Sequence, residues 1–414
     1  MSKHSLFQGW FTWGGSDRSR KPRPAGARSI GRTVAESGLF PVALFILLFG
    51  LVMVASASMP IAEKRFGEPL HYLLRQFGFA SIGLMVGMVV LQIPLQFWEK
   101  IAPTLLLISA LLLILVLFVG DKVNGAHRWL VLGPIRLQPS EFTKLAAFLY
   151  LAGYLVRHRE KVSNELFAVL RPIALLAGVG VLILIEPDLG AAFVMMVVVM
   201  VMMLLGGVRF SQFMLFILCG LLFLSVAIWM EPFRVSRIAS FLGDDPFLVD
   251  PQGRNYQITQ ALIAYGRGGW QGLGLGEGLQ KLFYLPEAHT DFILAVIAEE
   301  LGLIGTLSVV ALFAFLVWKS FWLASQASEC RQPYASYLAY GIGTWIGLQA
   351  LINLGVNMNL LPTKGLTLPL MSYGGSSLLV MMIAIALLMR VEYEICPLVH
   401  RKARNNRGAR RDHL

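Results

Sequence analysis

Charged residues are scarce in this chain of 414 residues: Asp, Glu, Lys and Arg make up 14% of the sequence, whereas about 25% is usual for a soluble domain. Cysteine is also scarce, and the three cysteines show neither a disulfide framework nor a CxxC or Cys/His spacing that suits a metal. No cleavable signal peptide is recognisable, because the first apolar block begins only at residue 39 and is too long for one. These absences exclude a soluble enzyme and a disulfide-stapled secreted domain.

Apolar residues are abundant instead, at 56% of the chain, and the mean hydropathy is +0.66. They come in long blocks such as 39–58 and 104–120. Each block approaches the roughly 20 residues that a helix needs to cross a bilayer. A disordered or collagen-like chain is therefore excluded, and so is an outer-membrane barrel, whose strands would alternate apolar and polar residues. The sequence predicts an all-α polytopic membrane protein.

Hydropathy places ten spans between a basic tail at 1–38 and a second basic tail at 391–414, so the predicted membrane domain covers 39–390. The span at 140–156 is the weakest, because Ser140, Glu141 and Lys144 lie inside its pattern. The ten predicted spans are 39–59, 71–91, 103–120, 140–156, 169–185, 190–207, 211–230, 291–318, 335–357 and 370–390.

The distribution of Lys and Arg predicts the orientation. If both tails are cytoplasmic, 22 of the 35 basic residues fall on the inner side, as the positive-inside rule requires. Basic tails on an anionic inner leaflet also explain the net charge of +11. A nucleic-acid partner is therefore not expected, because no folded or aromatic-rich basic module is present.

The connection at 231–290, between the seventh and eighth predicted spans, is far longer than usual connections between helices. It contains Trp270, Phe283, Tyr284 and the run NYQITQALIAYG, which argue against disorder. We predict a structured extracytoplasmic loop that covers the outer end of the bundle.

Six polar clusters lie at span ends, where ionisable groups are functional candidates because the membrane makes them costly. All six fall on the predicted outer side, so we expect the active surface to be external. The clusters are NGAHRW (124–129), QPSEFTK (138–144), EPDLG (186–190), YGRGG (265–269), YLPEAHTD (284–291) and LPTKGLTLPLMSYGGSS (361–377).

Asp291 is the strongest single candidate, because it stands at the start of the apolar run DFILAVIAEELG. An ordinary helix N-cap is the alternative, since Asp is a favoured capping residue. Glu287 and His289 lie within four residues of Asp291, and converging titratable groups suggest acid–base chemistry or metal binding. Glu299 and Glu300 face about 80° and 180° away from Asp291 on a helix. Those two carboxylates either relay protons or pair with basic residues of other spans.

The basic counterpart is Lys364, in a Pro-punctuated segment before a helix start at SYGGSS that includes Ser372. Helix N-termini with glycines and hydroxyls suit an anion. Arg128, Arg267 and Lys144, with Arg136, are further candidates for a pyrophosphate group, and for each the alternative is a snorkelling cation. The stretch GRGGWQGLGLGEG is weak as a phosphate motif, because it follows no strand and lacks GKS/T.

The six clusters, in this order across ten spans, resemble the SEDS family of peptidoglycan glycosyltransferases over about residues 39–395. The basic N-terminal extension, YLPEAHTDFI and PTKGLTLPLMSYGGSS are most similar to the members that act in division at the septum. The resemblance implies polymerisation of lipid II into β-1,4 glycan strands in the bacterial inner membrane, with release of undecaprenyl pyrophosphate. It also implies an essential role for Asp291, and a cavity lined by Lys364, Arg128 and Arg267.

The chemistry of such a reaction agrees with these residues. An inverting displacement needs a base for the acceptor hydroxyl and positive charge for the leaving pyrophosphate. Asp291 can act directly, or can hold a divalent cation (Mg or Mn) that lowers the pKa of the hydroxyl; no organic cofactor is expected. One departure from the family is Glu186, where Gln is usual before PDLG, and it makes a direct role for residue 186 doubtful.

Two other functions are compatible with ten spans. A lipid II flippase would need repeat halves with broken helices that meet near the midplane, whereas these clusters gather at one end. A non-enzymatic division scaffold does not explain the charged outer clusters. The resemblance implies a class B penicillin-binding transpeptidase as partner, with other membrane proteins of division.

Overall fold

The structure is a computed structural model that describes residues 38–123, 126–133, 135–230, 256–362 and 365–411. It is mainly helical. The long helices are α2 (Leu39–Phe66), α3 (His71–Gln92), α4 (Leu95–Val119), α5 (Pro139–Arg157), α7 (Leu166–Ile185), α8 (Leu189–Leu205), α9 (Phe210–Trp229), α13 (Ile293–Glu329), α14 (Pro333–Asn357) and α15 (Gly375–Arg411). Two shorter helices are α6 (Arg159–Asn164) and α12 (Tyr256–Gly268).

A helix occupies each position where the hydropathy predicted a span. Five of them are long and apolar enough to cross a membrane, namely α2, α3, α4, α7 and α13. Lipid offers no hydrogen bonds to the backbone, and a helix satisfies its own N–H and C=O groups. The chain is therefore a helical membrane protein.

Local signals set several helix ends. α5 and α14 both begin with a proline at the first turn, where the missing N–H costs nothing. The Asp188 carboxylate accepts a hydrogen bond from the Ala191 N–H at the start of α8, as an N-cap does. α2 ends at Gly67, whose φ of 70° is the left-handed conformation that stops many helices.

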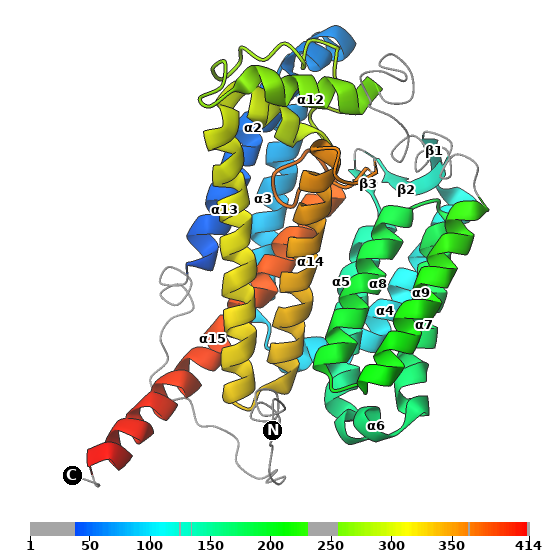
Figure 1. Cartoon of the computed structure of the whole chain (residues 1–414), viewed down its shortest axis with the longest axis vertical. Coiled ribbons are helices and arrows are strands. Elements are labelled where there is room, and N and C mark those ends of the chain that lie inside the picture. Colours follow the sequence, from blue (N-terminus) through cyan, green and yellow to red (C-terminus); the bar gives the residue numbers. More distant parts are fainter. Residues whose placement is uncertain (1–37, 124–125, 134, 231–255, 363–364, 412–414) are drawn as a thin grey trace, which may run out of the picture.

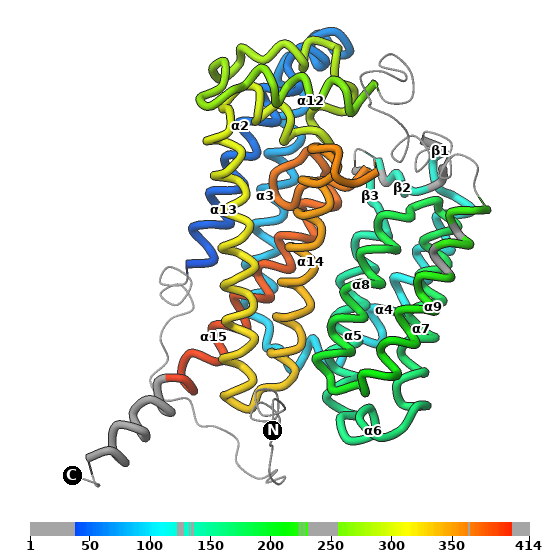
Figure 2. The backbone as a smooth tube through the Cα atoms, in the orientation of Figure 1, coloured from blue at the N-terminus to red at the C-terminus, as the bar shows by residue number. Residues whose placement is uncertain are grey.

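The helices form two groups that lie side by side (Figure 1). One contains α2, α3, α12, α13, α14 and α15, and the other contains α4, α5, α7, α8 and α9. α14 joins the groups, because it packs on α13 within its own group and on α5 and α8 of the other. The tube in Figure 2 follows the chain back and forth between the two ends of the bundle.

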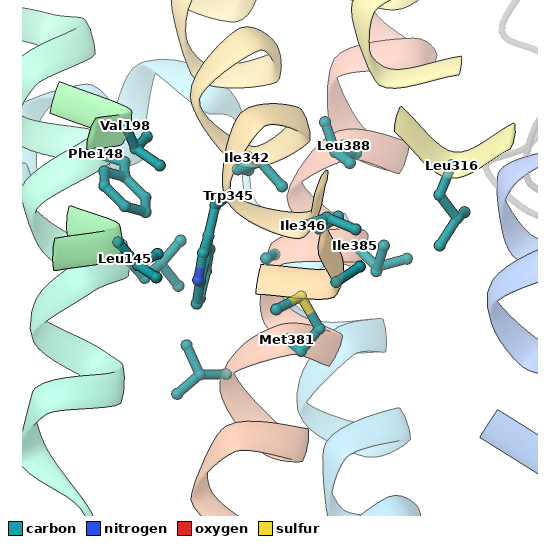
Figure 3. Close-up of a cluster of buried hydrophobic side chains, with 14 of the residues drawn as sticks. Leu145, Phe148, Val198, Leu316, Ile342, Trp345, Ile346, Met381, Ile385 and Leu388 are labelled. Atoms are coloured by element: carbon teal, nitrogen blue, oxygen red, sulfur yellow. The ribbon is translucent and has the colours of Figure 1, made fainter. Parts of the chain in front are cut away.

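The junction between the groups is a buried apolar cluster around Trp345 (Figure 3). The Trp345 ring extends from α14 toward Leu145 and Phe148 of α5, and its centroid lies 5.5 Å from that of Phe148 in an edge-on contact. Such aromatic pairs add about 0.5–1.5 kcal/mol to the gain from burial. The cluster fixes α14, and everything that α14 carries, relative to the second group.

A small antiparallel sheet corrects the all-α prediction. It has the order β1 (Asp121–Val123), β2 (Ala126–Leu132) and β3 (Ile135–Leu137), with Leu130 opposite Leu137. Its strands lie between α4 and α5, where the sequence had suggested only a polar cluster. β1 and β3 have only three residues each, too few to show an alternating pattern. β2, AHRWLVL, has seven residues but no strict alternation of apolar and polar residues, so hydropathy missed it as well.

The predicted loop 231–290 falls partly outside the described residues, which resume at Tyr256 with α12. From there to residue 290 the chain is folded against α13, and the rest of the predicted loop lies outside the described residues. The regular helical conformation of α13 is interrupted by a kink at Gly302, where φ is 66° and ψ is −161°. The Leu303 N–H donates to the Gly269 carbonyl at 2.9 Å, and the Gly274 N–H donates to the Glu300 carbonyl at 3.0 Å.

This close pairing explains the glycine-rich stretch GRGGWQGLGLGEG. A Cβ at Gly268 would collide with the Ala298 carbonyl, and one at Gly272 would collide with the Glu300 carbonyl. Glycine is needed there so that two backbones can approach each other. The stretch therefore has a structural role in docking the loop on α13.

Candidate functional site

The described parts of the six polar clusters gather at one end of the bundle (Figure 1). The three strands, α12, the turn between α7 and α8 and the connection between α14 and α15 all lie at this end. The prediction that the clusters share one face agrees with this arrangement.

Asp291 lies just before α13 and does not begin it, so the N-cap alternative is wrong. The helix starts at Ile293, and the N-cap residue is Phe292. The preceding turn is set by Glu287, whose φ is 56° and whose carbonyl accepts from the Thr290 N–H at 3.1 Å. That turn holds Asp291 at the end of the bundle, where the residue is half-buried.

Two asparagines of α14 hold the backbone of Asp291. The Nδ2 of Asn353 and the Nδ2 of Asn357 each donate to the Asp291 carbonyl oxygen at 2.9 Å. Gly365 lies against the carboxylate, since a Cβ built on this glycine would come 2.7 Å from Oδ2 of Asp291. The structure thus brings Asp291 beside the segment that follows Lys364.

His289 is buried between two tyrosines. Its ring centroid lies 4.7 Å from that of Tyr72 on α3 and 5.6 Å from that of Tyr373. The His289 carbonyl accepts from the Tyr373 N–H at 3.0 Å, which ties the turn before α13 to the turn before α15. Burial lowers the pKa of His289 below its ordinary value, against the opposing effect of Glu287. Burial therefore favours the neutral form of the imidazole.

Glu287 and Ser372 hold their own turns together. Glu287 is exposed, and its Oε2 accepts from the Thr290 hydroxyl at 2.8 Å. The Ser372 hydroxyl is buried and accepts from the Leu368 N–H at 2.9 Å. The Ser372 carbonyl accepts from Gln76 of α3 at 3.0 Å. Direct contact of either residue with a substrate stays a prediction.

Glu300 is paired, but its partner Lys281 comes from the loop before α13 and not, as the sequence had suggested, from another span. Its Oε1 lies 2.7 Å from Nζ of Lys281, and Ser56 of α2 donates to the same carboxylate at 2.8 Å. The Gly276 N–H donates to Oε2 at 3.1 Å. Sequence reasoning missed Lys281 as the partner, because the residue stands alone in a turn-rich segment.

Glu299 accepts the N–H groups of Leu279 at 3.1 Å and Gln280 at 3.0 Å. Nε of Arg267 lies 3.6 Å from Oε1 of the same carboxylate. Arg267 was predicted to bind an anion, and the structure gives it this internal partner while its side chain stays 38% exposed.

Arg128 lies on β2 and reaches the turn between α7 and α8. Its Nε donates to the Glu186 carbonyl at 2.8 Å, and Nη2 donates to the Pro187 carbonyl at 2.7 Å. The Asp188 carboxylate beside them accepts from Gln138 at 3.1 Å and Ser140 at 3.2 Å. These residues belong to β2, to the start of α5 and to the turn between α7 and α8, whereas Asp291 comes from the turn before α13 in the first helix group.

Glu186 is buried, and neither of its carboxylate oxygens has a hydrogen-bond partner within the described parts of the chain. Burial, reinforced by the nearby Asp188 and opposed by Arg128, raises the pKa of Glu186 to about 8. The side chain is therefore mostly protonated at neutral pH, and resembles in charge the amide that is usual in the family.

Lys144 is wholly buried on α5. Its Nζ lies 2.9 Å from Oε1 of Glu141, and 5.1 Å from the centroid of the Trp345 ring. The structure thus places Lys144 at the junction between the two helix groups. Contact with a pyrophosphate stays a prediction for this residue. Lys364, the predicted cation in the connection 361–377, lies outside the described residues.

A row of amides on α14 was missed by the sequence reasoning. Gln349, Asn353 and Asn357 recur every four residues and are all buried. Residues four apart lie on one face of a helix, so the spacing within an apolar span was an available signal. Tyr72 and Gln76 on α3 show the same spacing.

Together the fold and the site define a helical membrane protein with a half-buried carboxylate and several basic groups at one end. The model of the FtsW/RodA/SpoVE family of cell cycle proteins matches residues 37–395. The chain belongs to this family.

Curated relatives match over most of their length. One is the probable peptidoglycan glycosyltransferase FtsW of Nitrosococcus halophilus, 49% identical over 371 residues, which cover 89% of this chain and 95% of the relative. Another is the probable peptidoglycan glycosyltransferase FtsW of Legionella pneumophila, 49% identical over 354 residues, with 84% and 88% covered.

Solved structures agree with the fold. A chain from a peptidoglycan synthase complex, studied for the coordination of polymerization and crosslinking, is 28% identical with a TM-score of 0.72. The match covers 86% of this chain and 97% of that one. The rod shape determining protein RodA of Thermus thermophilus is 29% identical with a TM-score of 0.63, and 86% and 95% are covered.

Proposed function

We propose that this chain is a peptidoglycan glycosyltransferase that polymerises lipid II into β-1,4 glycan strands and releases undecaprenyl pyrophosphate. Membership of the FtsW/RodA/SpoVE family and the names of the curated relatives support this activity. The observation that carries the assignment of the site is the position of Asp291. Its half-buried carboxylate lies against Gly365, the residue that follows Lys364.

In the proposed reaction, Asp291 is the general base. The acceptor hydroxyl attacks the anomeric carbon of the donor sugar and forms the new C–O bond, while its proton passes to the carboxylate. The bond between that carbon and the pyrophosphate oxygen breaks, and the pyrophosphate leaves with the electron pair. A positioned base contributes about 10²–10⁴-fold to such a step.

The leaving pyrophosphate needs positive charge, which we assign to Lys364, Arg128 and Arg267. Arg128 donates to two uncharged carbonyls, so neither bond neutralises its positive charge. Arg267 is half-exposed beside Glu299, and a shared guanidinium can still donate to a second anion because it has five N–H groups. Preorganised donors of this kind stabilise the charge that develops in the transition state.

A divalent cation, Mg²⁺ or Mn²⁺, is a further proposal. No group of three or more His, Cys, Asp or Glu side chains within the described residues is placed to hold a metal. Mg²⁺ is commonly bound by one or two carboxylates together with substrate phosphates, and Asp291 suits that role. When bound, the cation would lower the pKa of the acceptor hydroxyl.

We further propose ten membrane spans, with both tails in the cytoplasm and the polar end on the outer face of the inner membrane at the division septum. The course of the chain back and forth between the two ends of the bundle (Figure 2) and the inward bias of Lys and Arg support this topology. Likeness to a chain from a peptidoglycan synthase complex supports a class B penicillin-binding transpeptidase as partner.

The test compares the wild type with Asp291→Asn, which keeps the shape of the side chain and removes the base. Each is purified, assayed for glycan synthesis from lipid II with and without the transpeptidase, and melted in detergent. We expect D291N to lose glycan synthesis by at least ~100-fold while its melting temperature stays unchanged. Substantial synthesis by D291N would overturn the assignment of Asp291.

A fluorescent lipid II flipping assay on the same proteoliposomes separates this function from transport. Flipping without synthesis by the wild type would favour the flippase. Neither activity, with or without the transpeptidase, would favour a scaffold.

A further inference from the structure

The amide row of α14 reaches the candidate site from inside the bundle. Gln349, Asn353 and Asn357 are 0%, 2% and 0% exposed. Successive members lie about 6 Å apart along the helix axis, at 1.5 Å per residue. The row therefore runs from the middle of α14 to its last turn, beside Asp291.

Each amide donates to a backbone carbonyl of another segment. Nε2 of Gln349 donates to the Thr367 carbonyl at 2.9 Å. Nδ2 of Asn353 donates to the Leu366 carbonyl at 2.7 Å and to the Asp291 carbonyl at 2.9 Å. An amide NH₂ has two protons, and Asn353 donates both of them to carbonyls of these two segments.

The lower end of the row is anchored. Nε1 of Trp345, one step further down α14, donates to Oε1 of Gln349 at 2.8 Å. Trp345 is itself clamped at the junction between the helix groups, against Phe148 and under Nζ of Lys144. The amides therefore project from a part of α14 that has little freedom to move, because close-packed interiors leave few voids into which a side chain could shift.

We propose that Asn353 is the positioning residue of this enzyme, which sets Asp291 relative to the segment 365–367. It acts through the two carbonyls that it holds, and Asn357 adds a second donor to the Asp291 carbonyl. This inference rests on the proposed function of Asp291 as the base.

The space beside the carboxylate makes such positioning consequential. Gly365 leaves room for Oδ2 of Asp291 but none for an added methyl group, which would come within 2.7 Å. The two segments are thus in close approach, and a shift of either moves the carboxylate against the other. A misplacement of about 1 Å at a reacting group can cost ~100-fold in rate.

The test replaces the donor and keeps the shape, in Asn353→Asp, and removes all polarity in Asn353→Leu. The matched control is Thr344→Val on the same helix, a near-isosteric change at a hydroxyl with no hydrogen-bond partner within the described residues. Asn357→Leu gives a graded case, because it removes one of the two donors to Asp291 and leaves the other.

Two quantities are measured on each purified protein, assayed with its transpeptidase partner: the initial rate of glycan synthesis at saturating lipid II, and the stoichiometry and Kd of lipid II binding. For N353D and N353L we expect a rate loss of about 30–100-fold with binding stoichiometry unchanged and Kd within about threefold. N357L should lose less, and T344V should match the wild type.

The outcomes are distinguishable. Variants that merely fold poorly would lose binding stoichiometry in proportion to rate, which would overturn a positioning role. Full synthesis by N353D and N353L, with D291N inactive, would overturn it too and leave the proposed function intact. Synthesis by D291N would instead overturn the proposed function on which this inference rests.

Discussion

Two polar regions at the same end of the bundle differ in how the surrounding residues bind their carboxylates. Glu299 and Glu300 are 0% exposed. Glu299 accepts from two backbone N–H groups and lies beside Arg267, and Glu300 accepts from one backbone N–H group and pairs with Lys281. At Asp291, the amides of α14 instead hold the backbone carbonyl and leave the carboxylate half-exposed.

The difference is the one expected between a structural carboxylate and the proposed base. A buried charge is tolerated when its partners are built into the fold, and the Glu300 set docks the loop 256–290 on α13 and α2. A base must keep an accessible lone pair near its substrate, and a fold that fixes the base through its backbone carbonyl does not use the carboxylate for that purpose.

The largest expected effect on stability comes from breaking the Glu300 pair. Lys281→Met leaves the Glu300 carboxylate buried without its cation, which typically costs about 3–5 kcal/mol. We expect a large fall in melting temperature, measured on the detergent-solubilised protein. Glu300→Gln added to K281M should restore part of it, and a melting temperature equal to that of the wild type in K281M would contradict a structural role.

A smaller change sharpens the other side of the comparison. Gly365→Ala adds one methyl group against Oδ2 of Asp291. The carboxylate must then move, so we expect glycan synthesis to fall by about 10–100-fold with little change in melting temperature. Gly67→Ala is the control for the effect of an added methyl group on synthesis and melting temperature, because nothing lies within 4 Å of the added Cβ. The φ of 70° at Gly67 adds backbone strain to this variant. Full activity in G365A would show that this contact is slack.

The smallest effect concerns Glu186. An ordinary Glu ionises near 4.5, whereas burial raises the pKa of Glu186 in the folded protein to about 8. Between these values the unfolded chain releases a proton that the folded chain keeps, so stability falls as pH rises through this window. Glu186→Gln does not titrate. Its melting temperature relative to the wild type should therefore be higher at pH 8 than at pH 5; an equal difference at both pH values would show that Glu186 is not buried as described.

Much of this architecture follows from the sequence for a simple reason. Apolar runs predict helices wherever lipid leaves the backbone no other partner, and all ten predicted positions hold a helix. The start of α15 near SYGGSS was predicted as well, and the structure begins it at Gly375.

What sequence reasoning missed depends on long-range contacts. Lys281 reads as a lone surface cation until the loop folds back over Glu300. The spacing of Gln349, Asn353 and Asn357 was visible in the sequence, but the acceptors of Asn353 were not, because Asp291 lies 62 residues away and Leu366 lies in the connection after α14. The start of α13 was predicted two residues early. The turn before the helix depends on a left-handed conformation at Glu287, and no local sequence pattern indicated that conformation.

The most direct measurement compares Asp291→Asn and Lys281→Met side by side, with glycan synthesis per folded protein and melting temperature recorded for both. We expect D291N to abolish synthesis and to melt like the wild type, and K281M to melt far lower and to keep synthesis in its folded fraction. Retained synthesis in D291N, or an unchanged melting temperature in K281M, would contradict this expectation.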